Sequence, residues 1–173
     1  MKSIRRLALL LLTPALLHAQ GSLTPPAGLP VASMKTLDQV EARTVVNKLT
    51  GDATAVYVIS TPGNYYLTGP ITGAAGKAGI RIDAADVTLD LHGFQLTGAA
   101  GATNGIIFYS GARGTIDGNH VSSSGTGINT PGTTSLVVRN IATANTTNFN
   151  LNAGQVVASS SAPGTNPNAN ITE

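Results

Sequence analysis

The sequence predicts an all-β protein, a short, single-stranded parallel β-helix of about four coils with an N-terminal cap. Short β-branched runs recur along the chain and are separated by Gly, Asn, Ser and Thr. Coil openings recur at Ile80, Ile106 and Ile128, each after a glycine, and at Phe149, so the intervals are 26, 22 and 21 residues. A near-constant period of this length indicates a solenoid, and the units contain neither a helical half nor a leucine-rich consensus.

The first residues have the order of features expected of a secretory signal peptide. Basic Lys2, Arg5 and Arg6 precede an apolar run over residues 7–17, and Ala19 offers a small residue for cleavage. The apolar run is too short to span a bilayer, which takes about 20 residues. We therefore expect residues 1–19 to be removed and the protein to be secreted, either to the periplasm or outside the cell.

Four further segments follow the signal peptide. Residues 20–33 contain three prolines and predict an extended leader. Residues 34–71 are expected to form the N-terminal cap, from a short helix and strands around the turn at residues 61–64. Residues 72–158 hold the coils of the β-helix, and the polar residues 159–173 form a C-terminal tail.

The composition excludes several classes of function. Of the ten Lys and Arg residues, three lie in the expected signal peptide, so seven bases face eight acids in the mature chain. This balance leaves no basic field for nucleic acid or an anionic membrane. The chain contains no cysteine, which excludes disulfides and thiolate metal sites. We expect no nucleic-acid partner and no membrane span.

Apolar residues that alternate with polar ones predict the inward face of each coil. The expected inward residues are Ile80, Ile82, Val87, Leu89, Leu91, Phe94, Leu96, Ile106, Phe108, Ile116, Val121, Ile128, Leu136, Val138, Ile141, Phe149, Leu151 and Val156. Stacked like on like, they predict one continuous apolar column.

The stretch "ADVTLDLHGF" places Asp86, Asp90 and His92 on one polar face. When each coil is counted from its opening isoleucine, Asp86 falls one position from the offset of Arg113. Oppositely charged side chains on adjacent strands form ordinary cross-strand pairs. We therefore expect Asp86 and Arg113 to serve the structure.

The same count aligns two further polar columns. Asp117 and Arg139 share one offset, and Asp90 falls one position from it. His92, Asn119 and Asn140 lie within one position of one another at a bend, where stacked amides can bond along the solenoid. We interpret these three residues as structural. Of the adjacent Tyr65 and Tyr66, one ring is expected to point outward and is the best single candidate for a ligand contact.

The chain resembles the secreted bacterial right-handed parallel β-helix repeat proteins. The resemblance rests on "MKTLDQVEART", "GIRIDAADVTLDLHGF", "GTIDGNHVSSSGTGI" and the ending "NPNANI", and it covers most of residues 34–171. It implies a right-handed coil and a member with fewer coils than usual. It carries no agreed catalytic residues and no cofactor.

Three functional hypotheses follow. The first is a non-catalytic surface or matrix protein that binds glycan or protein through its flat faces. The second is a polysaccharide lyase or glycoside hydrolase with Asp90, Asp117 and Arg139 as candidate catalytic residues, because glycoside hydrolysis uses two nearby carboxyl groups. Only a lyase would add calcium as a cofactor. The third is a structural subunit that associates with itself, as a spike-like trimer.

Overall fold

The computed structural model describes residues 42–109, 112–131, 134–152, 157–159 and 166–172. The expected signal peptide and leader lie outside these ranges. The described residues form sixteen β-strands and one three-residue 3-10 helix, η1 (Val46–Lys48). The predicted all-β class is confirmed.

The strands form three sheets in which each strand pair is parallel. Sheet A contains β1 (Arg43–Val45), β3 (Gly63–Tyr66), β6 (Val87–Asp90), β9 (Gly114–Asp117) and β12 (Leu136–Val138). Sheet B contains β2 (Ala55–Ile59), β5 (Ala78–Ile82), β8 (Asn104–Phe108), β11 (Thr126–Asn129) and β14 (Thr147–Asn150). Sheet C contains β4 (Ile71–Thr72), β7 (Gln95–Thr97), β10 (His120–Ser122), β13 (Ile141–Thr143), β16 (Asn170–Thr172) and β15 (Val157–Ser159), in this spatial order.

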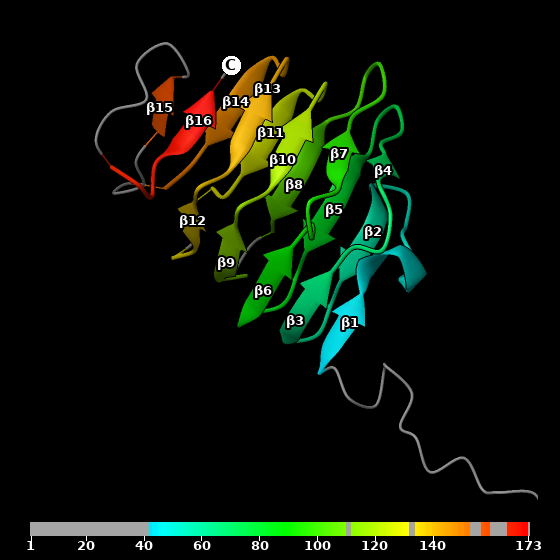
Figure 1. Cartoon of the computed structure of the whole chain (residues 1–173). Helices are drawn as coiled ribbons and strands as arrows, with labels where there is room; N and C mark the ends of the chain where they lie inside the picture. The colour runs from blue at the N-terminus through cyan, green and yellow to red at the C-terminus, as the bar shows by residue number, and fades with distance from the viewer. Residues whose placement is uncertain (1–41, 110–111, 132–133, 153–156, 160–165, 173) are drawn as a thin grey trace, which may run out of the picture. The chain divides into compact units, whose positions relative to one another are not determined.

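The chain visits sheets B, A and C in turn, which makes a parallel β-solenoid (Figure 1). Tyr57 pairs with Ile80, Ile80 with Ile106, Ile106 with Ile128, and Ile128 with Phe149. The sequence openings therefore occupy one column. The expected four coils are corrected to about five turns, because the turn that begins at β2 lacks a Gly-Ile opening.

The segment expected as a cap contributes strands to the solenoid itself. Residues 34–41 lie outside the described ranges. From residue 43 onward, β1 to β4 pair within the same three sheets as the later turns. The described part of this segment is thus the first turn, and its helical content is limited to η1.

The interior is an apolar column between the three sheets. Most of the expected inward residues are at most 1% exposed: Ile80, Ile82, Val87, Leu89, Leu91, Leu96, Ile106, Phe108, Ile116, Val121 and Ile128. Phe94, Phe149 and Leu151 pack against this core and are partly buried. Burial of this kind is the dominant favourable term in a fold without disulfides.

In the fourth turn, the residues that face inward differ from those predicted. Val137 is buried, whereas Leu136 is 50% exposed and Val138 lies on the same outer side. Three consecutive apolar residues in β12 leave the alternation ambiguous, and pairing with β9 decides it. In β13, likewise, Ala142 and not Ile141 takes the buried position. Val156 lies outside the described residues.

The glycine before each of Ile80, Ile106 and Ile128 is required by a close approach between sheets B and C. A Cβ atom on Gly105 would lie 2.1 Å from Val121 Cγ1 and 2.6 Å from the carbonyl oxygen of Gly127. At Gly79 it would lie 2.8 Å from Leu96 Cδ1. A larger residue would force these sheets apart. The Gly-Ile pair therefore recurs because only glycine fits at this close contact.

Buried asparagines form a ladder at the bend between sheets A and C. The Leu91 N–H donates to Asn119 Oδ1 at 2.6 Å, and the Asn119 N–H donates to Asn140 Oδ1 at 2.9 Å. The Asn140 N–H continues the ladder to Asn170 Oδ1 at 3.2 Å, and Asn140 Nδ2 donates to the Ile116 carbonyl at 3.0 Å. Among the described residues, every buried side-chain nitrogen and oxygen has a hydrogen-bond partner.

Replacing Asn140 with Ala should lower the free energy of unfolding by at least about 2 kcal/mol, because it leaves several buried backbone groups without partners. Chemical denaturation of the folded chain measures this loss. Asn150→Ala is the matched control, because Asn150 is exposed and its Nδ2 donates to Asn129 Oδ1 at 2.9 Å, outside the buried ladder. We expect the control to change stability by less than about 0.5 kcal/mol. Equal losses would contradict a structural role for the ladder.

Candidate functional site

Each described aspartate lies beside an arginine. The pairs are Asp52–Arg81 and Asp83–Arg81, both at 2.8 Å, Asp86–Arg113 at 2.9 Å, Asp90–Arg43 at 3.5 Å, and Asp117–Arg139. These contacts set the electrostatics of the outer faces of sheets A and B, because few other charged side chains are described.

Two cross-turn pairs form between the residues that the count of offsets brings together. Arg113 Nε and Nη2 donate to the two carboxylate oxygens of Asp86 at 2.9 and 3.1 Å. Arg139 Nε and Nη2 likewise donate to the two carboxylate oxygens of Asp117. The Arg113 hydrogen bonds lower the pKa of the Asp86 carboxyl. The pairs are partly to largely exposed, so solvent screening limits their contribution to stability.

Asp90 lines the same shallow pocket on sheet A as Asp117 and Arg139. Its ion-pair partner, however, is Arg43 at the first turn, and the Arg43 guanidinium also lies 4.7 Å from the centre of the Tyr66 ring. The structure therefore brings the three candidate catalytic residues to one surface but does not place Asp90 in the Asp117–Arg139 pair.

His92 does not join the asparagine ladder, which corrects the sequence-based expectation. Four residues separate β6 from β7, whereas two separate β9 from β10 and two separate β12 from β13. The longer bend carries His92 outward with a positive φ of 55°, and its ring meets the Tyr66 ring edge-on at 5.8 Å. Asn170, from the expected polar tail, completes the ladder that His92 does not enter.

A pocket on the outer side of sheet B combines an exposed aromatic ring with fixed polar groups. We call it the Tyr109 pocket. It is lined by Thr54, Gly76, Ala78, Arg81, Asp83, Thr103, Asn104, Ile107 and Tyr109, and has a volume of about 580 Å³. This volume lies within the range of small-molecule sites, about 300 to 1,000 Å³. Tyr109 is 58% exposed, and its ring centre lies 5.6 Å from the Arg81 guanidinium carbon.

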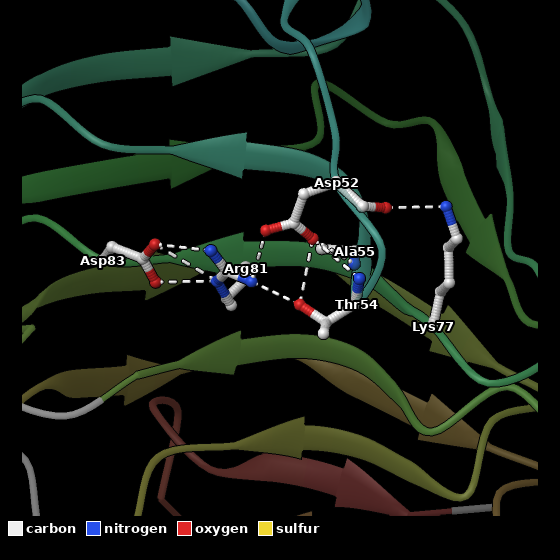
Figure 2. Close-up of polar contacts among 6 residues, drawn as sticks. All are labelled: Asp52, Thr54, Ala55, Lys77, Arg81 and Asp83. Atoms are coloured by element: carbon white, nitrogen blue, oxygen red, sulfur yellow. Dashed lines mark hydrogen bonds and ion pairs between the residues drawn. The ribbon is translucent and has the colours of Figure 1, made fainter.

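Arg81, from β5, is the centre of the polar wall (Figure 2). Its Nε donates to both Asp83 oxygens at 2.9 and 3.1 Å, and its Nη2 donates to Asp83 Oδ2 at 2.8 Å. Its Nη1 lies 2.8 Å from Asp52 Oδ2 and donates to Thr54 Oγ1. Held from both sides, the guanidinium has little freedom to reorient.

Asp52 is fixed in turn by its own loop. Its Oδ1 accepts the Thr54 N–H at 2.7 Å, the Thr54 hydroxyl at 2.9 Å and the Ala55 N–H at 2.9 Å. The Lys77 ammonium donates to the Asp52 carbonyl oxygen at 2.6 Å (Figure 2). The Thr54 backbone hydrogen bond is the largest cause that lowers the pKa of the Asp52 carboxyl to about 2.

Sequence reasoning missed this pocket. It assigned the outward aromatic contact to Tyr65 or Tyr66, but both rings are buried, and the Tyr65 hydroxyl donates to the Thr61 carbonyl at 2.8 Å. Tyr109 follows β8 directly, and its outward position depends on pairing between turns. The available signal was Arg81, a lone charge between inward Ile80 and Ile82.

No three His, Asp or Glu side chains gather to form a metal site among the described residues. No helix in these ranges is long and apolar enough to cross a membrane.

The architecture defines the class of protein, a parallel β-solenoid of about five turns. No family model matches the chain, and no curated protein or solved structure matches it significantly.

The Asp52 carboxyl should titrate near pH 2 in an NMR titration of the side-chain carboxyl carbon. Because its pKa is lowered in the folded state, its contribution to stability is fully present above about pH 4 and is lost as the pH falls through about 2. Arg81→Gln should raise this pKa only in part, since the Thr54 N–H is the larger cause. A full return to the ordinary value near 3.8 would show that Arg81 alone controls Asp52.

Proposed function

We propose that this chain is an exported, non-catalytic β-solenoid that binds a neutral saccharide in the Tyr109 pocket. The observation that carries the proposal is the exposed Tyr109 ring beside polar groups that the parallel sheet holds in place. These groups come from different turns, so the backbone pairing of β5 with β8 fixes their separation.

The lining of the pocket suits a hydroxyl-rich ligand with an apolar face. The tyrosine ring offers a flat apolar surface with a polar tip, on which the C–H face of a sugar can pack. The carboxylate of Asp83 accepts hydrogen bonds, the Asn104 amide donates them, and the Thr103 hydroxyl does both. A few placed polar groups around an apolar contact are the usual means of orienting a small ligand.

The charges around the pocket favour a neutral saccharide over an acidic one. Asp52 and Asp83 balance Arg81 and Lys77, so these four residues leave no net charge. The Arg81 nitrogens that would hydrogen-bond to a uronate carboxylate already donate to the two aspartates and Thr54. A bound uronate would therefore face two carboxylates without a guanidinium of its own.

The proposal also includes export from the cell and a relationship to the secreted β-helix repeat proteins. The order of features in residues 1–19 supports passage through the secretory route. The solenoid supports the likeness to secreted bacterial β-helix repeat proteins, whose right-handed coil we propose for this chain as well. A surface or matrix role follows from export combined with saccharide binding.

Tyr109→Ala should weaken binding of neutral oligosaccharides by at least about tenfold, because it removes the central apolar contact. A glycan array followed by calorimetry on the best ligand measures the change. Leu136→Ala is the matched control, since Leu136 is also a large exposed apolar side chain but lies on sheet A, away from the pocket. Tyr109→Phe should retain most of the affinity. Unchanged binding in Tyr109→Ala, or a uronate preference, would contradict the proposal.

A second candidate function is hydrolysis or cleavage of a polysaccharide on sheet A. It is favoured by one observation, that Asp90 and Asp117 line the same pocket with Arg139. Two carboxyl groups on one surface are the minimum that glycoside hydrolysis needs. The lyase form of this hypothesis would also require bound calcium.

If sheet A is catalytic, Asp90→Asn and Asp117→Asn should each abolish product release from polysaccharides while the circular dichroism spectrum stays unchanged. Reducing-end and unsaturated-product assays, with and without calcium, measure this on the folded chain. Asp86→Asn is the matched control, because Asp86 pairs with Arg113 on the same sheet. Absence of any product from the unmodified chain would reject this candidate and leave the binding proposal intact.

A further inference from the structure

A second row of asparagine side chains, which we call the outer asparagine row, leads along sheet B to the Tyr109 pocket. Asn150 Nδ2 donates to Asn129 Oδ1 at 2.9 Å, and the two residues are register partners on β14 and β11. Asn129 Nδ2 donates in turn to Asn104 Oδ1 at 3.0 Å. Asn104 lines the pocket. The hydrogen bonds of the row therefore run in one direction, toward the pocket.

This direction decides which end of the Asn104 amide a ligand can use. Because Asn104 Oδ1 accepts from Asn129, the Nδ2 group is the end that remains for the ligand. An amide that accepts a hydrogen bond through its oxygen is polarised, and it donates more strongly through its nitrogen. The pocket thus offers a fixed donor at Asn104, and the ligand must bring an acceptor oxygen to it.

Asn104 and Tyr109 lie at opposite ends of one strand. β8 begins at Asn104, and Tyr109 directly follows its last residue. At about 3.3 Å per residue, their backbone positions are roughly 16 Å apart. A ligand that packs on the Tyr109 ring and also reaches Asn104 therefore lies along β8. This separation favours a ligand of two or more sugar units over a single ring.

The pocket wall between these two ends contains an apolar side chain. Ile107 is half-buried on the outer side of β8 and is the register partner of Arg81. A sugar hydroxyl packed against Ile107 would lose its hydrogen bonds to water without gaining a partner, whereas a methyl group gains from burial. The Thr103 hydroxyl and the Asp83 carboxylate, which also line the pocket, can accept a hydrogen bond from an N–H group.

We propose that the ligand is a neutral oligosaccharide of N-acetylated amino sugars. This inference rests on the proposed binding of a neutral saccharide in the Tyr109 pocket. One sugar ring packs on Tyr109, and the acetamido group of a neighbouring unit matches the rest of the wall. Its carbonyl oxygen accepts from Asn104 Nδ2, its methyl group packs on Ile107, and its N–H donates to Thr103 or Asp83. An acetamido group is uncharged, and so are all the residues of β8, β11 and β14.

Chitotriose and cellotriose form the test pair, because both are neutral trisaccharides with the same linkage and differ in carrying an acetamido group or a hydroxyl. Calorimetry on the folded chain should give a dissociation constant at least about tenfold lower for chitotriose, from one added hydrogen bond and one buried methyl group per acetamido contact. Asn104→Ala should reduce this preference to about threefold or less, because it removes the donor.

Asn129→Ala tests the outer asparagine row itself. Asn129 is outside the pocket lining and acts through Asn104, so it is a positioning residue, and its loss should lower the preference for chitotriose by about threefold. Gln95→Ala is the matched control. Gln95 also donates its amide to one neighbour, Ser122 Oγ, at 2.7 Å, but it lies on sheet C. We expect the control to leave the preference unchanged.

The outcomes separate this inference from the binding proposal on which it rests. Equal affinity for the two trisaccharides would overturn the acetamido inference and leave saccharide binding in place. A chitotriose preference that persists in Asn104→Ala would overturn it as well, because the preference would then arise elsewhere. If neither trisaccharide binds, the acetamido inference is wrong, and the glycan array decides independently whether the Tyr109 pocket binds another neutral saccharide.

Discussion

Parallel backbone pairing between successive turns is the constraint on which the rest of this structure depends. Once Ile80, Ile106 and Ile128 are paired, each neighbouring residue has a fixed partner one turn away. Apolar residues then stack into the core, asparagines into a ladder, and charges into cross-turn pairs. Without disulfides, this regular stacking must supply both stability and specificity. The buried amides add the specificity, since a displaced turn would leave them without partners.

The same pairing explains why a small, charge-poor chain can hold a defined pocket. Arg81 on β5 and Ile107 on β8 are register partners, and the loop before β2 brings Asp52 alongside. Each polar group is fixed by a neighbour: Asp83 and Asp52 hold Arg81, and Thr54 holds Asp52. Preorganisation of this kind lowers the entropic cost of binding, because the groups need not be ordered by the ligand.

Periodicity predicted the fold class, most of the core and the Asp86–Arg113 and Asp117–Arg139 contacts, since all of these depend on offsets within a regular repeat. Prediction from periodicity failed where the repeat is irregular. His92 is displaced by a longer bend, β12 contains three apolar residues in a row, and the first turn lacks the glycine that precedes Ile80, Ile106 and Ile128. The Tyr109 pocket could not be predicted in this way, because it joins Thr54, before any recognisable repeat, to residues of two later turns.

The four-residue bend between β6 and β7 shows where such a chain can change its length without harm. It holds two more residues than the corresponding bends of the next two turns, yet the pairing on both of its sides is undisturbed. Strand lengths are tied to the strands above and below, whereas this bend accommodates two extra residues around its buried ladder contact, the Leu91 N–H to Asn119 Oδ1. Insertions and deletions are therefore absorbed at the corners, and new loops, with new surface chemistry, can be added there while the scaffold stays the same.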